Sequence, residues 1–567
     1  MKKHTDRAKW GEIPTVPFTA QSSETTARIK TGAWRNIEPF YKNVTPPCVG
    51  DCLAGEDVVR QLTLVSEDKF TSAVELLREA NPFPAICGRV CPHPCELNCS
   101  RAELGGVIKI HMVERFLGDY SIEKGMQYQP RAKRKEKIAV VGSGPAGLSC
   151  AFYLAQEGFH VIVFESLDVI GGLLRTGIPP YRLPREVLDS ELKIFGKLPV
   201  TFEFKKQLGV NISLDELKRF DASFISIGRY ASRRLGLDNE SAPQVYEGVN
   251  LLRSIHCGSV PSLGKTVIII GGGNTALDCA RSVLRLGCQP IIVYRRTENE
   301  MPAFKEEIEE AKEEGIKIIT LAVPIQIKLK GSKLASVEFV RMELGKSDAS
   351  GRPTPVPIQE DNFTLDADSL VKATGEIADL ELLKSVVKVN QRGVVIDDNF
   401  STPIAGVFSG GDCVGITGTV AEAIRDGRVA AASIEKYLTD TTNIKVNIAN
   451  TRGVQSEPFD KKRLNTTYIE NAMAVASHRV SPQHRIGSFC EVYEGFTRGD
   501  ILYEAGRCIS CGTCTLCDNC LVFCPDRAVK RNSSGYHIDY DYCKGCAICV
   551  EECPRGAIYM RGASKNK

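Results

Sequence analysis

The sequence predicts an α/β protein with a small cysteine-rich domain at each end. An apolar strand, a glycine-rich turn and a helix follow one another twice, from residues 138 and 266. Six of the 22 cysteines lie between Cys48 and Cys99, and ten lie between Cys508 and Cys553. The 567 residues are enough for about three to five domains, so we expect these features to lie in separate domains.

Composition and charge exclude several classes of protein. The 72 basic and 69 acidic residues leave a net charge of +3, which provides no basic field for nucleic acid. Hydrophobic residues at 43% and charged residues at 25% are typical of folded globular proteins. No apolar run approaches the roughly 20 residues that a membrane helix needs. We therefore expect a cytoplasmic protein without nucleic-acid binding or membrane insertion.

Residues 1–130 predict a small α-helical domain organised around its cysteines. Val58–Leu64 and Ser72–Ala80 have the pattern of short helices between proline- and cysteine-rich turns. Cytosolic thiols stay reduced, so iron–sulfur or metal ligation is a better interpretation than disulfides. The candidate ligands are Cys48, Cys52, Cys87, Cys91, Cys95 and Cys99.

The first strand–turn–helix unit predicts a Rossmann-like dinucleotide-binding domain, whose first part spans residues 131–255. Its glycines permit a tight turn, close approach of the backbone to a pyrophosphate, and close packing of helix on strand. The pyrophosphate would lie at the start of the helix. Glu165 ends the next strand, where a carboxylate can accept hydrogen bonds from ribose hydroxyls. The motif comprises Gly142, Gly144, Pro145, Ala146 and Gly147.

A second unit of the same kind, in residues 256–385, begins at the strand Thr266–Ile270. Arg295 and Arg296 end its second strand, in the place where the first unit has an acid. Arginines would pair with a 2′-phosphate, so this unit favours NADP; the alternative is that they only solvate a loop. The motif residues are Gly271, Gly273, Asn274, Thr275 and Ala276.

The order of the elements predicts that one dinucleotide-binding domain is inserted in the other. Strand-like Gly393–Asp397 and Gly406–Ser409 indicate that the first domain resumes over residues 386–437. The polar stretch Gly345–Asn362 predicts a surface loop. Residues 438–505 predict an extended connector.

Residues 506–567 predict an α+β ferredoxin-like domain with two [4Fe–4S] clusters. Both Cys514-x2-Cys517-x2-Cys520-x3-Cys524-Pro525 and Cys543-x2-Cys546-x2-Cys549-x3-Cys553-Pro554 have the bacterial ferredoxin spacing. Zinc knuckles are the alternative. The fourth cysteine of each run serves the other cluster in such pairs. The expected sets are Cys514, Cys517, Cys520 and Cys553, and Cys543, Cys546, Cys549 and Cys524.

Three further segments carry a resemblance to a known family. Gly171–Pro179, Ala373–Gly375 and Phe408–Asp412 resemble the flavin-side signatures of the glutamate synthase small subunit. That family includes the amino-terminal half of dihydropyrimidine dehydrogenase and the large subunit of NADH-dependent ferredoxin:NADP oxidoreductase. The resemblance covers roughly residues 40–437 and implies FAD in the first cradle and NADPH in the second. The site residues that it adds are Gly172, Leu173, Arg175, Thr374, Gly375, Gly411 and Asp412.

The amino-terminal domain of this family commonly holds two [4Fe–4S] clusters, yet residues 1–47 here contain no cysteine. One cluster is expected, and a second would lack ligands if only this segment contributed. Cys508 and Cys511 are left over after the ferredoxin sets, and they could fold back to complete an amino-terminal cluster. The alternatives are that Glu114 or His93 fills the vacancy, or that the extra cysteines are simple thiols.

Together these parts predict an FAD- and NADP-dependent iron–sulfur oxidoreductase, an electron-transfer subunit of a hetero-oligomer in anaerobic metabolism. NADPH gives electrons in pairs, clusters accept them singly, and a flavin does both. Hydride transfer depends on positioning, so no catalytic side chain is predicted. The partner would be a ferredoxin or another oxidoreductase subunit. The alternatives are an electron-bifurcating transhydrogenase, a glutamate synthase small subunit, a self-sufficient NADPH:acceptor reductase, and a non-enzymatic electron-carrying scaffold.

Overall fold

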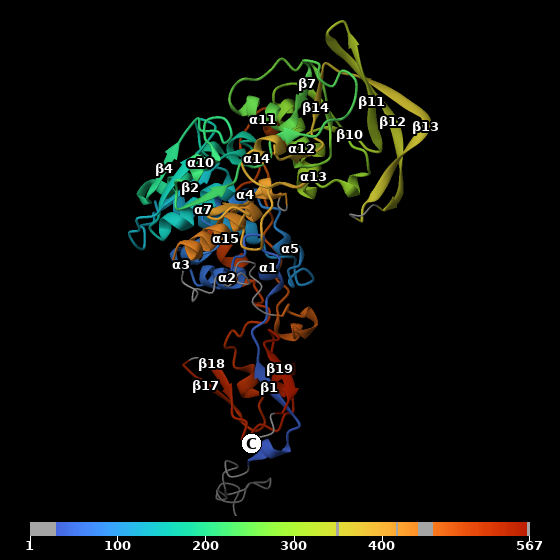
Figure 1. The fold of residues 1–567 in the computed structure, drawn as a ribbon. Helices are drawn as coiled ribbons and strands as arrows, with labels where there is room; N and C mark the ends of the chain where they lie inside the picture. Colours follow the sequence, from blue (N-terminus) through green and yellow to red (C-terminus); the bar gives the residue numbers. More distant parts are fainter. Residues whose placement is uncertain (1–29, 348–350, 416–417, 440–456, 534, 564–567) are drawn as a thin grey trace, which may run out of the picture. The chain divides into compact units, whose positions relative to one another are not determined.

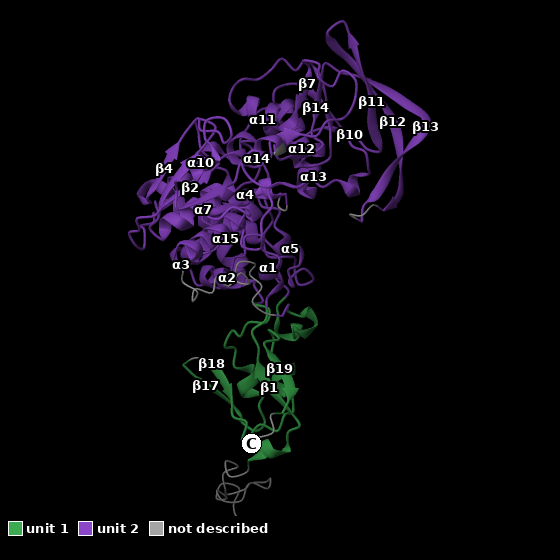
Figure 2. Ribbon diagram, viewed as in Figure 1, with its two compact units in different colours: residues 1–44, 459–470, 510–567 green, residues 45–458, 471–509 purple. Residues whose placement is uncertain are grey.

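The computed structural model describes residues 30–347, 351–415, 418–439, 457–533 and 535–563. The chain divides into two compact units (Figure 2). The smaller unit contains residues 1–44, 459–470 and 510–567, and the larger unit contains residues 45–458 and 471–509. Within the described ranges, no helix combines the length and the apolar character needed to cross a membrane.

The first sheet of the larger unit has five parallel strands in the order β16-β5-β2-β3-β4. Its central strands are runs of buried apolar residues, as expected for a parallel sheet that is covered on both faces. Helices α7 (Pro145–Gln156) and α15 (Val420–Thr439) lie side by side in this layer (Figure 1). The strands are β2 (Lys137–Val141), β3 (His160–Phe164), β4 (Val200–Glu203), β5 (Ala222–Ile225) and β16 (Val407–Ser409).

A second parallel sheet has the order β10-β9-β8-β14-β7, and all its strands lie between β5 and β16 in the sequence. Helices α11 (Gly248–His256), α12 (Asn274–Arg285) and α13 (Lys305–Glu313) belong to the same region of the chain. The strands are β7 (Val245–Glu247), β8 (Thr266–Ile270), β9 (Gln289–Val293), β10 (Lys317–Ile319) and β14 (Ser369–Lys372).

The expectation of a surface loop over Gly345–Asn362 is wrong, because most of this stretch is strand. It belongs to a three-stranded antiparallel sheet of β11 (Ala322–Lys330), β12 (Lys333–Ser347) and β13 (Pro353–Asp366) (Figure 1). Residues 348–350 lie outside the described ranges. Much of β13 is exposed, so its side chains can be polar without leaving the sheet.

The expected strand Gly393–Asp397 is also absent from the described structure; an isolated bridge joins Val389 to Val394 instead. Gly393 has φ of +155°, and a Cβ atom there would overlap the carbonyl oxygen of Cys413. Asn390 N–H donates to the Gly393 carbonyl at 2.9 Å, so the chain reverses here. The glycine serves a close backbone approach that a strand pattern does not reveal.

Six short helices form the cysteine-rich part of the larger unit, and the expected helices near residues 58–64 and 72–80 are confirmed. Helix α18 (Arg498–Gly506), which is distant in sequence, packs on α2 and α6 through Ile501 and Ala505. The six helices are α1 (Pro47–Gly50), α2 (Val58–Ser66), α3 (Phe70–Arg78), α4 (Pro84–Val90), α5 (Pro94–Leu97) and α6 (Ile110–Glu123).

Short elements connect these layers, and part of the expected connector, residues 440–456, lies outside the described ranges. Residues 471–509 hold α17 (Pro482–Ile486) besides α18, so the connector is folded where it is described. The other short elements of the larger unit are α8 (Leu173–Thr176), α9 (Arg185–Leu192), η3 (Lys193–Lys197), α10 (Leu214–Leu217), β6 (Ala231–Ser232), η4 (Glu298–Glu300), β15 (Glu376–Ile377), α14 (Leu380–Lys384) and η5 (Asp412–Val414).

The smaller unit combines a segment from near the start of the chain with segments from near its end. β1 (Ile37–Tyr41) pairs antiparallel with β19 (Ile558–Gly562), and β17 (Val529–Asn532) pairs with β18 (Gly535–Ile538). Residues 37–41 were expected to belong with residues 1–130, whereas their strand pairs with the carboxyl-terminal segment. The remaining elements are η2 (Thr31–Trp34), η6 (Lys461–Arg463), η7 (Thr466–Tyr468), α19 (Asn519–Val522) and α20 (Ile548–Glu551).

Candidate functional site

One cavity of about 540 Å³ in the larger unit is lined by residues of both glycine-rich turns. This volume lies within the range of about 300–1,000 Å³ that is typical of small-molecule sites. The first turn contributes Gly142, Gly144, Pro145 and Ala146, and the second contributes Asn274 and Thr275. The structure therefore brings the two predicted cradles to the same cavity.

The backbone of the first cradle fits a pyrophosphate. Gly142 has φ of +98°, and a Cβ atom there would lie 2.5 Å from the carbonyl oxygen of Ser226. A Cβ atom on Gly147 would overlap the carbonyl oxygen of Gly142. No heavy atom lies within 4 Å of the Cβ position of Gly144, which faces the cavity. The glycines thus have the three separate roles that the motif predicts.

Glu165 lines the same cavity and is only 4% exposed. Its carboxylate accepts hydrogen bonds from the Ser143 backbone and hydroxyl, at 2.9 and 2.5 Å, and from Leu167 N–H at 2.8 Å. These bonds fix the carboxylate at the end of β3 and join it to the glycine-rich turn. The sequence predicted its place at the strand end but not its protein donors.

The residues of the Gly171–Pro179 segment have different roles. A Cβ atom on Gly172 would lie 2.9 Å from Gly144 Cα, so these two glycines allow the segment to reach the cradle. Leu173 lines the cavity. Arg175 is not among the lining residues; its Nε donates to the Ile170 carbonyl at 2.8 Å, and its guanidinium pairs with Asp189.

Thr374 and Gly375 do not line the cavity, but the next residue, Glu376, does. The Thr275 hydroxyl donates to the Glu376 carboxylate at 3.0 Å, which links the second cradle to the strand end after β14. Gly375 has φ of +104° and its carbonyl accepts from Arg233 N–H. These two residues therefore shape the turn that presents Glu376.

Gly411 and Asp412 line the cavity beside the first cradle and precede α15; a Cβ atom on Gly411 would lie 2.8 Å from Ala146 Cβ. Gly411 has φ of +73°, and its N–H donates to the buried Asp426 at 3.2 Å. Burial raises the pKa of Asp412 to about 6, with Arg229 opposing the shift and Asp426 adding to it. Burial thus disfavours the charged form of this carboxyl group.

The second cradle differs from the first at the end of β9. Arg295 is exposed, whereas Arg296 is 3% exposed and its Nε donates to the Pro353 carbonyl of β13 at 2.7 Å. Asn274 accepts a hydrogen bond from Phe304 N–H at 3.0 Å, and Ala276 is fully buried. Neither arginine lines the cavity. The sequence predicts the same role for both arginines, but in the structure Arg295 is exposed and Arg296 is buried.

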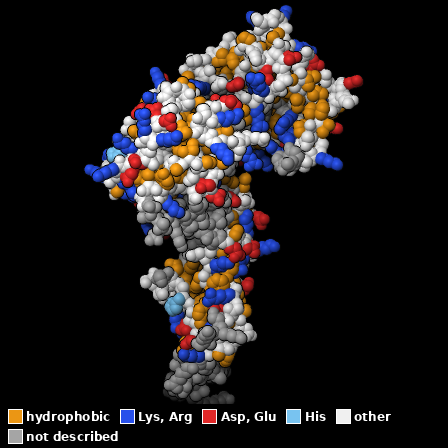
Figure 3. Space-filling view, viewed as in Figure 1, with side chains coloured by type: hydrophobic (Ala, Val, Ile, Leu, Met, Phe, Trp, Pro, Cys, Tyr) orange, Lys and Arg blue, Asp and Glu red, His pale blue; other side chains and the backbone are white. Residues whose placement is uncertain are grey.

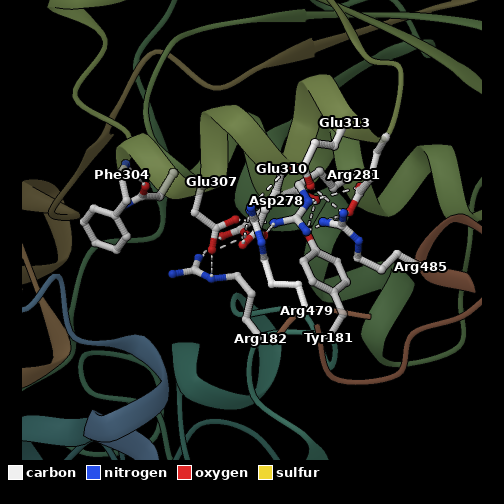
Figure 4. A network of polar contacts seen from close by, with 12 residues as sticks. Tyr181, Arg182, Asp278, Arg281, Phe304, Glu307, Glu310, Glu313, Arg479 and Arg485 are labelled. Carbon is white, nitrogen blue, oxygen red and sulfur yellow. Dashed lines mark hydrogen bonds and ion pairs between the residues drawn. The ribbon is translucent and has the colours of Figure 1, made fainter. Parts of the chain in front are cut away.

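A buried network of charges next to the cavity was not predicted (Figure 4). Arg182, which lines the cavity, pairs with Asp278 at 2.9 Å and with Glu307 at 2.7 Å. Asp278 and Phe304 also line the cavity. Because Arg182 precedes β4 and the two acids lie on α12 and α13, these pairs join the two sheet regions of the larger unit.

The network continues through Arg281, whose side chain has no exposed area. Its guanidinium contacts Glu307, and it lies 2.8 Å from both Glu310 and Glu314. The guanidinium groups of Arg281 and Arg285 both contact the ring of Tyr181, at 4.6 and 4.1 Å from the ring centroid. Buried charges of this kind are tolerated because each has a partner of opposite sign.

Residues of the folded connector complete the network. Arg485 and Arg479 pair with Glu313 at 2.5 and 3.1 Å, and Val492 N–H donates to the Tyr181 carbonyl at 3.0 Å. The acid-rich run at residues 306–314 was the one available signal, and alone it is typical of an ordinary solvated helix face.

The amino-terminal cysteines gather around a second, small cavity. It is lined by Cys52, Cys87, Cys91 and Cys95, and also by Glu56, His93 and Glu114. Burial raises the pKa of Cys91 and Cys95 well above the ordinary value. Burial and the neighbouring Glu56 raise the pKa of Glu114 in the same way. Thiolate ligands in this setting need a cation or cluster to compensate their charge.

Cys48, Cys99 and Cys508 pack against the hydrophobic core of the same helical region. Cys508 lies two residues after the end of α18, and both the helix and the cysteine pack at the core that Cys48 and Cys99 contact. Cys511 belongs to the other compact unit. Among the described residues, no three His, Cys, Asp or Glu side chains have the spacing for a single metal ion.

The carboxyl-terminal cysteines lie in two groups. Cys524, Cys543, Cys546 and Cys549 line one small cavity. Burial raises the pKa of Cys520, and the nearby Cys514, Cys553 and Cys517 raise it further. We call one group set A, which comprises Cys514, Cys517, Cys520 and Cys553. We call the other group set B, which comprises Cys524, Cys543, Cys546 and Cys549.

Three family patterns match this chain at the places just described. The pattern of the pyridine nucleotide-disulphide oxidoreductases matches residues 136–427, which include both cradles. The chain belongs to this family. The pattern of dihydropyrimidine dehydrogenase domain II, a 4Fe–4S cluster domain, matches residues 23–126, and a 4Fe–4S binding domain matches residues 536–559.

Named relatives of this oxidoreductase cover most of its length. The NADP(+)-dependent formate dehydrogenase subunit beta of Moorella thermoacetica is 35% identical over 86% of this chain and 73% of its own. The NADPH-Fe(3+) oxidoreductase subunit beta of Geobacter sulfurreducens is 32% identical over 84% of this chain and 76% of its own. The glutamate synthase [NADPH] small chain of Escherichia coli is 34% identical over 69% of this chain and 89% of its own.

The expected family and reaction class are therefore confirmed. This pyridine nucleotide-disulphide oxidoreductase is an FAD- and NAD(P)H-dependent enzyme of the glutamate synthase small-subunit type, with 4Fe–4S domains at both ends. The glycine cradles and the cysteine groups supply the donor chemistry that these cofactors need.

Proposed function

We propose that this chain is the NADPH-binding subunit of a hetero-oligomer, in which electrons pass between NADP(H), FAD, the amino-terminal cluster and the ferredoxin-like clusters. The external partner would be a ferredoxin or another oxidoreductase subunit. The relatives named as beta subunits support a role within a larger assembly. Reduced thiolate ligands support a cytoplasmic location.

The observation that carries this proposal is the wall between the large cavity and the cysteine-lined cavity. Val420 and Ala423, at the start of α15, line the large cavity, while Ala421 between them lines the cavity of Cys52, Cys91 and Cys95. Val90, the neighbour of Cys91, also lines the large cavity. One helical turn thus separates a dinucleotide site from a cysteine site, a short path for single electrons.

The residues of the chain act by binding and positioning. The Gly142–Gly147 turn would hold the FAD pyrophosphate, and Asn274 and Thr275 would hold the nucleotide at the opposite side of the same cavity. FAD, when bound, exchanges electrons with NADPH in pairs and with a cluster singly. The Arg182, Asp278 and Glu307 contacts keep the two cradles facing each other, which is what hydride transfer requires.

We infer the cluster ligands from the same geometry. Set A and set B would each hold one [4Fe–4S] cluster. Cys52, Cys91 and Cys95 would hold an amino-terminal cluster, with Cys87 or Glu114 in the fourth position. Cys48, Cys99 and Cys508 would contribute ligands to a second one, which their packing at one core supports.

We also propose domain boundaries that follow the predicted ones in the middle of the chain. Residues 131–255 and 386–437 would form most of the FAD-binding domain and residues 256–385 most of the inserted NADP-binding domain; β7 (Val245–Glu247) pairs with β14 and so would belong to the inserted domain. The location of the whole second sheet between β5 and β16 supports the insertion. Residues 506–567 with β1 would form the ferredoxin-like domain. Arg295 would select NADP through the 2′-phosphate.

The test removes one cluster and measures whether NADPH still reduces the flavin. Cys546→Ala in the full chain should lower the iron content by about four atoms per chain and leave reduction of the flavin by NADPH intact. Cys257→Ala, which removes an exposed thiol outside every set, is the matched control and should change neither. A folded Cys546→Ala protein that has lost flavin reduction would contradict the proposed order. So would wild-type protein whose flavin stays oxidised under excess NADPH.

A further inference from the structure

The two cysteine sets of the smaller unit have nearly equivalent backbone surroundings. The two runs are offset by 29 residues, so that Cys520 corresponds to Cys549 and Cys524 corresponds to Cys553. Ala528 N–H donates to Cys524 Sγ at 3.2 Å, and the equivalent Ala557 N–H donates to Cys553 Sγ at 3.4 Å. Each set therefore receives one such backbone hydrogen bond on its distant cysteine.

Tyr41 breaks this equivalence. Its hydroxyl oxygen lies 3.3 Å from Cys520 Sγ, in set A. In the part of the chain that the structure describes, Cys549 in set B has no hydroxyl at its sulfur. A thiolate bound to iron carries no proton, so the hydroxyl must be the donor when the cluster is present.

The position of the tyrosine is fixed by the strand that carries it. Tyr41 is opposite Ile558 in the antiparallel pair of β1 with β19, which lie side by side as blue and red strands in Figure 1. A slip of one residue would turn its side chain to the other face of the sheet. Its ring stacks on Tyr536 at 6.3 Å between centroids, and the Tyr536 hydroxyl donates to Asp518 at 2.6 Å.

Contacts along the same segment hold β1 in this register. Gly32 N–H donates to the Asp541 carbonyl at 2.8 Å, and Lys42 N–H donates to the Ala557 carbonyl at 3.2 Å. The Tyr540 hydroxyl donates to the Pro39 carbonyl at 2.9 Å. The segment is thus anchored on both sides of Tyr41, which keeps the tyrosine on the face of the strand that meets Cys520.

We propose that Tyr41 raises the reduction potential of the cluster held by set A, through its hydrogen bond to Cys520. This inference rests on the proposed function, in which set A holds a [4Fe–4S] cluster. Reduction adds an electron and increases the negative charge on the cluster sulfurs, so a hydroxyl donor stabilises the reduced form more than the oxidised form. Tyr41 acts through Cys520 and is therefore a positioning residue that orders the two clusters by potential.

The experiment is a redox titration of the anaerobically prepared full chain, followed by electron paramagnetic resonance. The signal lost in Cys517→Ala is assigned to set A, and the signal lost in Cys546→Ala is assigned to set B. Tyr41→Phe should move the set A potential to more negative values and leave the set B potential unchanged. Tyr540→Phe is the matched control, because it removes a hydroxyl that holds the same strand without touching a cysteine, and both potentials should stay where they are.

A second measurement keeps the inference testable if Tyr41→Phe does not assemble its cluster. In wild-type protein exchanged into D₂O, electron–nuclear double resonance should detect one more exchangeable proton at the set A cluster than at the set B cluster. Equal numbers of exchangeable protons, or an unchanged set A potential in Tyr41→Phe, would overturn the role of Tyr41. Absence of both cluster signals from wild-type protein would instead contradict the proposed function.

Discussion

The helices that follow the two glycine-rich turns, α7 and α12, begin with similar sequences and have different neighbours. Along α7, small residues allow close contact: a Cβ atom on Gly427 of α15 would overlap the Ala146 carbonyl, and the Ser149 hydroxyl donates to the Ile424 carbonyl at 2.7 Å. Along α12, Asp278 and Arg281 are buried in a network of ion pairs. The same local motif therefore begins two helices, one of which is held by close packing and the other by ion pairs.

The two cradles are therefore supported in different ways. The first cradle is held by close packing, because a Cβ atom on Gly147 or on Gly427 of α15 would overlap a neighbouring backbone carbonyl. The second is held against the rest of the larger unit by side chains from α13, the Tyr181–Arg182 segment and the connector (Figure 4). On the face shown in Figure 3, Lys and Arg are interspersed with Asp and Glu.

The largest expected effect comes from removing the central cation of α12. Arg281→Met would leave Glu307, Glu310 and Glu314 without their shared partner, so the free energy of unfolding should fall by about 3–5 kcal/mol. Lys305→Met is the control; it changes the net charge equally at an exposed position and should have little effect. Adding Glu314→Gln to Arg281→Met should restore part of the loss in thermal unfolding, and a further loss would contradict the charge-pairing account.

The same network predicts the acid sensitivity of the protein. Burial alone would raise the pKa of Glu314, but hydrogen bonds from Arg285 and Arg281 hold it at about 2. A carboxylate with a lowered pKa contributes stability that is fully present above its ordinary value of 4.5 and is lost as the pH falls toward 2. In Arg281→Met this pKa rises, so unfolding measured by circular dichroism should begin at a higher pH. An unchanged acid midpoint would refute this explanation.

A smaller effect is expected where α7 needs close packing. Gly147→Ala would place a methyl group against the Gly142 carbonyl and Ser226, and should lower the free energy of unfolding by about 1–3 kcal/mol while reducing the bound flavin. The opposite change at the equivalent position, Ala276→Gly, should cost about 1 kcal/mol or less. Flavin absorbance and thermal unfolding measure both; equal effects would mean that the two helices are packed alike.

The smallest expected effect concerns the two arginines after β9. Arg295→Ala should weaken NADPH binding about tenfold and leave NADH binding unchanged, since one charge-assisted hydrogen bond is worth about 1.5 kcal/mol. Arg296→Ala should mainly lower stability, because the Arg296 side chain is buried and bonded to Pro353. Titration with both nucleotides distinguishes these outcomes, and an equal loss for NADPH and NADH in Arg295→Ala would exclude a 2′-phosphate contact.

Features that depend on a few consecutive residues could be read from the sequence alone. The glycine positions in residues 142–147 and the cysteine spacing after residue 513 reflect turn geometry and cluster ligation, both of which are local. The helices near Val58 and Ser72 follow from apolar periodicity in the same way. The predictions for 345–362 and 393–397 failed, because there the outcome depended on exposure and on a backbone contact with a distant residue.

Long-range packing determines which distant segments of the chain meet. β1 pairs with β19 across about 520 residues, and α18 packs on α2 and α6 from more than 370 residues away. The donor to Cys520 comes from such a long-range contact, and the acidic partners of Arg281 lie 26–33 residues further along the chain; both contacts depend on burial and register that no local pattern encodes. Short sequence motifs thus identified the cofactors, whereas long-range packing determined how the cofactor sites are connected and which side chains contact them.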